Sequence, residues 1–276
     1  MTIAEWLQTN DQMCIDIVKR KYLLDEDILG HKETIDELLD RVSGGNKKAR
    51  NLMAKRKFIP GGRIIANRGL QKYGVRVTYS NCYVDAPPED SIESIYNTCA
   101  RLARTFSYGG GIGIDISKLA PNGAKVNNSA KHSTGAVSFV NTFSQVSETI
   151  GQLQRRGALM ISIDGHHPDL LEFITHKSDL GVTQGANMSV RMTDDFFEAV
   201  KNDETWKMTF ERPETGEMIE RTTHARDILN LIAKTNWDYA EPGLLYWDTI
   251  SNYNLMSEDP NFEYAGTNPC AENICY

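Results

Sequence analysis

Several common classes of protein are excluded by what this sequence has little of. Its 276 residues contain five cysteines, an odd number, and no Cys-x-x-Cys pair. That composition argues against a secreted disulfide framework and against a thiolate zinc site. No apolar run approaches the roughly 18 residues of a membrane helix, and the first residues do not form a signal peptide. The net charge of −7 argues against a broad basic face for duplex nucleic acid. We therefore expect a cytoplasmic protein with free thiols and with neither a membrane nor a nucleic-acid partner.

The common phosphate-binding motifs are missing as well. A glycine run at Gly109, Gly110, Gly111 and Gly113 fits neither G-x-G-x-x-G nor a Walker loop ending in G-K-[ST]. Such a run either lets backbone N–H groups approach a ligand or forms a tight packing turn. The glycines alone leave both interpretations open.

Histidines and paired arginines give weaker signals. His166, His167 and His176 do not have convincing ligand spacing, so we predict no metal site. Arg155 and Arg156 precede an apolar segment, where they suit phosphate or base recognition or form a solvated charge pair.

The pattern of apolar residues predicts an α/β fold preceded by helices. Residues 1–57 show helical spacing and form an expected helical cap, with one helix near 32–57. Over 58–276, strands and helices alternate, which is typical of a largely parallel sheet. The composition of residues 118–134 predicts a long surface loop, and such loops are usually functional. The expected strands lie at 75–84, 111–116, 158–164 and 187–193, and the expected helices include 91–106, 137–150 and 225–240.

An amide, a thiol and a carboxyl recur at every second residue in N-P-C-A-E, near the end of the sequence. Pro269 disfavours a helix, and in an extended segment Asn268, Cys270 and Glu272 would face the same side. These groups suit hydrogen bonding, nucleophilic or radical chemistry, and proton transfer. The alternative is an edge strand with a buried cysteine and two solvated polar residues. Cys82, on another expected strand, is either part of a site or a small core residue.

Taken together and in this order, several short segments match a known family. From about Phe58 to Glu272 the chain resembles the catalytic (large) subunit of ribonucleotide reductase. The matching segments are FIPGGRIIANRGL, SNCYV, PEDSIESI, ARTFSYGGGIGIDISKL, RRGALM, HPDLLEFITHK, NMSVRMTDDF, EPGLLYWD and TNPCAE. The resemblance implies a ten-stranded α/β barrel made of two five-stranded parallel halves, with a finger loop inside it. Residues 58–276 would then form the first half-barrel and end in the finger loop.

The resemblance also implies roles for individual residues. Cys270 matches the cysteine whose thiyl radical removes the 3′ hydrogen of the ribose, and Glu272 matches the base for the 3′-hydroxyl proton. Asn268 would hydrogen-bond the substrate, and Cys82 would be the first of two cysteines that reduce the 2′ position and end as a disulfide. Further expected substrate-binding residues are Ser80, Asn81, Gly110 and Gly111.

A second group of residues resembles the family's effector site, which binds deoxynucleotides or ATP and sets substrate specificity. The loop that begins at Lys118 resembles one effector loop. No nucleotide-binding cone precedes Phe58, so no overall activity site is expected. The expected effector residues are Asp90, Ser91, Ile92, Lys118, Gln154, Arg155 and Arg156.

The resemblance leaves the source of the radical open between two classes. The residues of FIPGGRI, RRGALM and TNPCAE are more similar to the adenosylcobalamin-dependent class. The alternative radical source is a separate metal-containing subunit. The implied partners are a ribonucleotide, a thioredoxin- or glutaredoxin-type reductant, and a second copy in a homodimer.

The sequence departs from the family pattern after Glu272, where only NICY follows. The family chain continues with the other half-barrel and the second reducing cysteine, and Cys275 lies too close to Cys270 to replace that cysteine. We therefore expect an N-terminal portion of the enzyme that is active only with a complementary C-terminal polypeptide. The alternative is a catalytically inactive fragment that binds deoxynucleotides or serves assembly.

Overall fold

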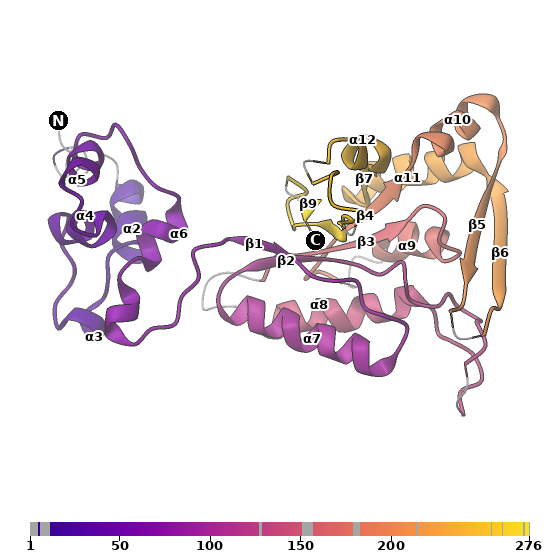
Figure 1. Ribbon diagram of the computed structural model, residues 1–276, viewed down its shortest axis with the longest axis horizontal. Helices are drawn as coiled ribbons and strands as arrows, with labels where there is room; N and C mark the ends of the chain where they lie inside the picture. The colour runs from indigo at the N-terminus through magenta and orange to yellow at the C-terminus, as the bar shows by residue number, and fades with distance from the viewer. Residues whose placement is uncertain are drawn as a thin grey trace. The chain divides into compact units, whose positions relative to one another are not determined.

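The computed structural model describes residues 5, 12–126, 129–150, 157–178, 183–213, 215–254, 256–260, 262–272 and 274–275. The chain divides into two compact units, Met1–Asn81 and Cys82–Tyr276, both drawn in Figure 1. None of the helices among the described residues is both long enough and apolar enough to cross a membrane.

The first unit is helical over the described residues. Its helices pack around a small core of Leu38, Leu39, Val42 and Met53. The single helix expected near 32–57 is in fact two, because Gly44 ends the first of them in a left-handed conformation with φ 59°. The elements are α2 (Gln12–Lys21), α3 (Glu26–Leu29), α4 (Ile35–Ser43), α5 (Lys47–Ala54), α6 (Gly62–Asn67) and η1 (Leu70–Tyr73).

The second unit is built on a parallel five-stranded sheet, which confirms the mainly parallel α/β fold. The strand order is β1 (Cys82–Val84), β2 (Gly111–Asp115), β3 (Leu159–Asp164), β4 (Asn187–Met192) and β7 (Gly243–Tyr246), and every neighbouring pair is parallel. The strand expected over 75–84 is much shorter, because only its last three residues pair with β2. The other strands are the antiparallel hairpin of β5 (Thr205–Glu211) and β6 (Met218–His224), and the short pair β8 (Gly266–Thr267) and β9 (Ile274–Cys275).

Helices cover one face of the sheet. In Figure 1, α7 and α8 lie on one side of it, and the C-terminal segment with β9 lies on the other. Ile112, Ile114, Leu159, Ile161 and Val190 are buried and form one core with apolar residues of these helices. The helices of this unit are α7 (Ile92–Ser107), α8 (Val140–Thr149), α9 (Leu170–Thr175), α10 (Asp194–Asn202), α11 (Ala225–Tyr239) and α12 (Trp247–Asn252), with the short turns η2 (Ala136–Phe139) and η3 (His176–Ser178).

The opposite face of the sheet carries small and polar residues. Side chains alternate along a strand, so Gly111, Gly113 and Asp115 face away from the helices. Their neighbours in the ladder include Cys82 beside Gly111 and Ser162 beside Asp115. This face therefore differs in composition from the helix-covered core, and it is the face that the C-terminal segment approaches.

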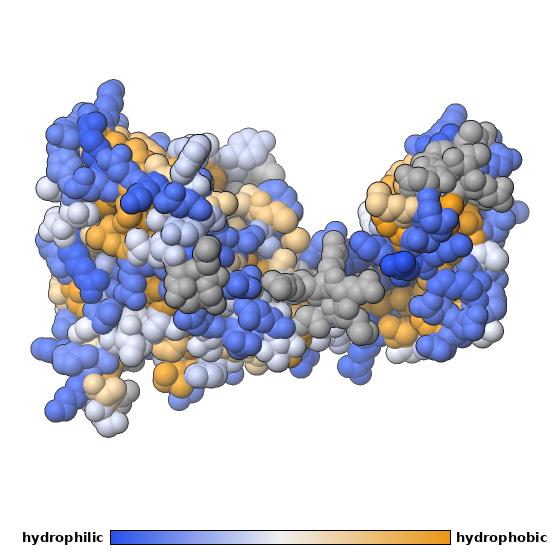
Figure 2. All heavy atoms as spheres, turned by 180° about the vertical axis from the view of Figure 1, so that it is seen from behind, coloured by the Kyte–Doolittle hydropathy of each residue, from blue (hydrophilic) through white to orange (hydrophobic). Residues whose placement is uncertain are grey.

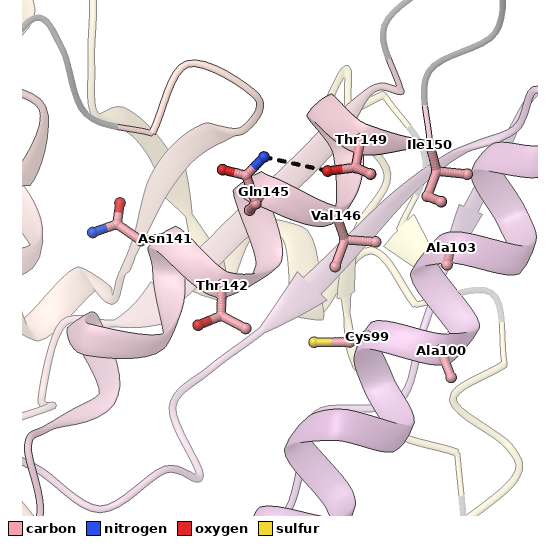
Figure 3. A pocket seen from close by; sticks show the side chains of 9 residues that line it. All are labelled: Cys99, Ala100, Ala103, Asn141, Thr142, Gln145, Val146, Thr149 and Ile150. Atoms are coloured by element: carbon pink, nitrogen blue, oxygen red, sulfur yellow. Dashed lines mark hydrogen bonds between the residues drawn. The ribbon is translucent and has the colours of Figure 1, made fainter.

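Large apolar side chains also remain on the surface. Trp237 is 89% exposed and Tyr253 is 77% exposed, and Figure 2 shows apolar side chains between polar ones on the surface of both units. A groove of about 670 Å³ lies between α7 and α8, with Cys99 on α7 opposite Thr142 and Val146 on α8 (Figure 3). The folding of this chain therefore leaves some apolar surface uncovered in the described residues.

Candidate active site

The glycines of β2 allow the C-terminal segment to lie directly on the sheet. A Cβ atom on Gly113 would overlap the carbonyl oxygen of Thr267, and one on Gly111 would come within 2.9 Å of Cγ of Pro269. Gly110 is enclosed in the same way, because a Cβ atom added to it would lie 2.8 Å from a ring carbon of Tyr83. Of the two interpretations of the glycine run, close packing is thus observed, and the backbone that approaches belongs to the protein itself.

The N-P-C-A-E segment forms a turn, and the extended conformation expected for it is wrong. The amide of Ala271 donates to the carbonyl of Asn268 over 3.0 Å, and Ala271 has a φ of 61°. Proline at the second position of a four-residue turn is favoured because its ring fixes φ. Asn268 is consequently buried at 1% exposure, while Cys270 and Glu272 are exposed. The three side chains do not share one face as a strand would place them.

The turn nevertheless brings three of the expected site residues together. Desolvation raises the pKa of the Cys270 thiol, although the side chain is exposed, and interactions with the Glu272 carboxylate and the Cys82 thiol raise it further. The strand register agrees, because Cys82 lies beside Gly111 in the sheet and Pro269 covers Gly111. Cys270 and Glu272 of the turn therefore form one cluster with Cys82, which is far away in sequence and lies on β1 next to the glycine-containing strand β2.

A buried polar network occupies the carboxyl ends of the strands on the same face. Asp115, at 2% exposure, accepts a hydrogen bond from the Ser162 hydroxyl over 2.6 Å and lies 3.1 Å from Nε of Arg191. Arg191 also pairs with Asp164 at 3.3 Å, and its guanidinium lies 4.5 Å from the ring centroid of Trp247. Sequence reasoning missed these residues. The available signal was the alternation of apolar with small or polar residues in GIGID and LMISID, each of which ends in an aspartate.

Asp164 links this network to His166. Burial opposes ionisation of Asp164, but the hydrogen bond to His166 and the charge of Arg191 outweigh it and lower the pKa of the carboxyl. The same hydrogen bond raises the pKa of His166, whose Nδ1 lies 3.1 Å from Asp164. Among the described residues, no group of three or more histidine, cysteine, aspartate or glutamate side chains could hold a metal ion.

The expected effector residues of the second unit form a separate group. One oxygen of Asp90 accepts the amide of Ala120 over 3.0 Å, and the other lies 3.1 Å from a guanidinium nitrogen of Arg212. Lys118 pairs with Glu89 at 2.6 Å. Ser91 caps α7 by accepting the amide of Ser94, and Ile92 is 57% exposed. Gln154, Arg155 and Arg156 lie outside the described residues.

The long loop over 118–134 is held by the H-P-D segment. His167 is buried; its Nε2–H donates to the carbonyl of Leu119, and its Nδ1 accepts the amide of Asp169. These bonds need a neutral ring, and burial lowers the pKa of His167 accordingly. Asp169 in turn accepts the amides of Asn122 and Ala136. His167 therefore anchors the loop through the carbonyl of Leu119.

The remaining two expected residues, Ser80 and Asn81, belong to the first unit. Both are exposed, and the side-chain oxygen of Asn81 accepts a hydrogen bond from Nε of Arg63 over 2.8 Å. The sequence predicts both residues on one strand with Cys82, whereas the described strand begins at Cys82.

The fold and the cluster define an α/β protein whose candidate site is a pair of cysteines and a carboxyl next to a glycine-containing strand. Residues 80–276 match the family model described as the barrel domain of ribonucleotide reductase. The chain therefore belongs to the ribonucleotide reductase family.

Curated relatives align with this chain over most of its length. It is 34% identical to the vitamin B12-dependent ribonucleoside-diphosphate reductase of Thermoplasma acidophilum, over 87% of this chain and 31% of the relative. It is 28% identical to the protein of the same name from Mycobacterium tuberculosis, over 94% of this chain and 38% of the relative. A vitamin B12-dependent ribonucleotide reductase of Streptomyces avermitilis is 31% identical over 70% of this chain. The chain thus spans about a third of the length of the first two relatives.

Proposed function

We propose that this chain supplies the radical cysteine and one reducing cysteine of a ribonucleotide reductase, which converts ribonucleotides to 2′-deoxyribonucleotides. The observation that carries the proposal is the cluster in which Cys270 interacts with both Cys82 and Glu272, where the C-terminal turn lies on the glycines of β2. The five parallel strands and the turn on their polar face support a half-barrel with a finger loop. A site that depends on free thiols requires a reducing compartment, so we place the protein in the cytoplasm.

In the proposed reaction, the sulfur radical of Cys270 takes the hydrogen atom from C3′ of the ribose. Glu272 accepts the 3′-hydroxyl proton, and the 2′-hydroxyl leaves as water. Cys82 and a second cysteine supply two electrons and two protons and become a disulfide. Glu272 then returns the proton to the 3′ oxygen, and Cys270 returns its hydrogen atom to C3′. Each turnover therefore consumes one pair of thiols, which a thioredoxin- or glutaredoxin-type reductant would regenerate.

The electrostatics of the cluster suit this chemistry. Hydrogen-atom exchange needs an S–H bond rather than a thiolate, and the raised pKa keeps Cys270 protonated near neutral pH. The buried Asn268 lies at the start of the turn that presents Cys270. We assign it, together with Gly110 and Gly111, to substrate binding. Holding the reacting atoms in place is the main contribution a protein makes to such a near-balanced exchange.

The radical source we propose is adenosylcobalamin, because the curated relatives named above are vitamin B12-dependent. The residues present fit this cofactor in one respect: the Cys270 side chain is exposed, so its thiol can be reached from outside the sheet. When bound, the cofactor would supply the one-electron oxidising equivalent that the thiol needs. A separate metal-containing subunit is the alternative source.

We further propose that a deoxynucleotide or ATP effector binds near Asp90 and Lys118 and sets substrate specificity. Asp90 and Ser91 lie immediately before α7, which begins at Ile92, and Asp90 contacts the start of the 118–134 loop through Ala120. Gln154, Arg155 and Arg156 would report the identity of the effector to the substrate. Such regulation requires two states of the loop with different affinities for effector.

Turnover would require the remaining length that the relatives possess, on the same polypeptide or on a second one. The test is reconstitution with such a polypeptide, adenosylcobalamin and dithiothreitol, with deoxynucleotide formation from a radiolabelled ribonucleotide as the readout. We expect product from the reconstituted protein, none from the 276-residue chain alone, and none from the Cys270→Ser variant. The matched control is Cys99→Ser, in the groove between α7 and α8, which should retain activity.

Turnover by the Cys270→Ser variant would contradict the proposed mechanism. Deoxynucleotide binding without any turnover by the wild-type complex would favour the alternative of a catalytically inactive nucleotide-binding protein. The contacts of Asp90 would suit that alternative equally well, because they do not involve the thiols.

A further inference from the structure

The β5–β6 hairpin is tied to the candidate effector site by contacts between segments far apart in sequence. Arg212, just after β5, pairs with Asp90 at 3.1 Å. Glu217 accepts the amide of Lys125 over 3.1 Å, and Arg221 donates to the carbonyl of Asn122 over 2.8 Å. Figure 1 shows the end of the hairpin beside this part of the chain. The hairpin was not among the elements expected to serve the effector.

The ion pair between Arg212 and Asp90 is largely withdrawn from solvent. The Arg212 side chain is 4% exposed and that of Asp90 is 24% exposed. By contrast, the pair between Lys118 and Glu89 is 53% and 67% exposed, where salt and water weaken it. Arg212 is also fixed through its backbone, because its amide donates to the carbonyl of Glu217 and its carbonyl accepts the amide of Gly216. The hairpin turn therefore fixes the backbone position from which the Arg212 side chain reaches Asp90.

The two known hydrogen bonds of Asp90 leave acceptor capacity for a ligand. One oxygen accepts Ala120 and the other accepts Arg212. An ionised carboxylate offers about four acceptor positions, so each oxygen retains one. The donors that a deoxynucleotide can offer to a carboxylate are its sugar hydroxyl and the amino groups of its base. Because both oxygens are already held, such a donor would meet a carboxylate of fixed orientation.

We propose that Arg212 is a positioning residue of the effector site, which orients Asp90 for a deoxynucleotide and ties the β5–β6 hairpin to the loop that begins at Lys118. This inference rests on the proposed effector site at Asp90. It adds to that site a residue 122 positions away, on an element with no expected part in binding. The function of Arg212 is exerted through Asp90 and requires no contact with the nucleotide.

The experiment is titration calorimetry of the chain with dATP, dGTP and dTTP, for the wild type and for Arg212→Gln, Asp90→Asn and the double variant. We expect Arg212→Gln to weaken binding about tenfold, of the order of one lost charge-assisted hydrogen bond. If Arg212 acts through Asp90, the double variant should bind no more weakly than Asp90→Asn alone. A purely structural role would not produce this non-additivity.

Two controls accompany the titration. Arg226→Gln removes an exposed ion pair of similar length, in which Nε of Arg226 lies 3.0 Å from a carboxylate oxygen of Asp203. This variant should leave the dissociation constants of the three deoxynucleotides unchanged. Arg212→Lys keeps the positive charge and should recover part of the affinity, which covers the case in which Arg212→Gln does not fold. Thermal unfolding of each variant shows which of them are folded.

The outcomes separate this inference from the effector site itself. Wild-type binding that Arg212→Gln and Arg212→Lys leave unchanged would overturn the role of Arg212 alone. Additive losses in the double variant would show that Arg212 does not act through Asp90, which also overturns the inference. Absence of binding by the wild-type chain would contradict the effector site of the proposed function, and this inference with it.

Discussion

The two faces of the five-stranded sheet show how one strand can serve stability and chemistry at once. On the helix-covered face, Ile114 and Ile161 are at most 1% exposed and belong to the main core. On the other face, the neighbouring residues Gly113 and Ser162 are small, and the C-terminal segment lies against Gly113 through Thr267 and Asn268. The first face contributes burial of apolar area, while the second leaves room for a second segment and its functional groups.

This difference follows from the alternation of side chains along a strand. A parallel sheet that is covered by helices on both faces has nearly continuous apolar strands. In GIGID and LMISID, every second position is instead glycine, serine, aspartate or Met160. The departure from continuous apolarity therefore marks the face on which a site could be built.

The largest expected effect on stability comes from the helix-covered face. Replacing Ile161 by alanine should lower the free energy of unfolding by about 2–5 kcal/mol, because it leaves a cavity in a fully buried position. Replacing the adjacent Ser162 by alanine removes its hydrogen bond to Asp115 and should cost less, about 1–3 kcal/mol. Urea unfolding followed by tryptophan fluorescence compares the two variants. If Ser162→Ala lowered the free energy of unfolding more than Ile161→Ala does, the helix-covered face would not be the one that contributes most to stability.

A smaller effect should appear in the reactivity of the cluster on the other face. Iodoacetamide reacts with the thiolate, so the raised pKa predicts that alkylation of Cys270 has its midpoint above the ordinary value of about 8.5. Glu272→Gln removes a negative charge and should shift that midpoint to lower pH. Cys82→Ser should shift it in the same direction but by less, because the electrostatic effect of Glu272 is the larger.

The measurement is the pH dependence of the alkylation rate at Cys270, followed by peptide mass spectrometry. A midpoint that neither variant moves would mean that Cys270 is not in contact with these groups in solution.

The sequence predicted much of the fold because its main elements have clear local signals. The helix expected over 91–106 is observed as Ile92–Ser107, where apolar residues recur at helical spacing. The strands over 111–116 and 187–193 are observed as Gly111–Asp115 and Asn187–Met192. For each of these, one buried stripe or a short apolar run was enough to identify the element.

Other features could not be predicted because they depend on contacts far along the chain. Pro269 disfavours a helix and is compatible with an extended segment, but proline also favours the second position of a turn, and a turn forms here. Two ion pairs join residues that are 76 and 122 positions apart, namely Arg191 with Asp115 and Arg212 with Asp90. No local sequence pattern predicts such long-range pairs. The cluster of Cys82 and Cys270 was expected only from the family resemblance.

The central claim is that the C-terminal turn brings Cys270 to Cys82, which lies on β1 beside the glycines of β2. Mild oxidation of the chain with diamide, followed by mass spectrometry of its peptides without reduction, tests it directly. The wild type and Gly61→Ala, whose added Cβ meets nothing within 4 Å, should both give a Cys82–Cys270 disulfide. Gly113→Ala should lose it, because its Cβ displaces Thr267 and the turn that follows. If wild-type Cys82 instead linked only to Cys14, Cys99 or Cys275, or if Gly113→Ala formed the Cys82–Cys270 link as readily as the wild type, the account would be contradicted.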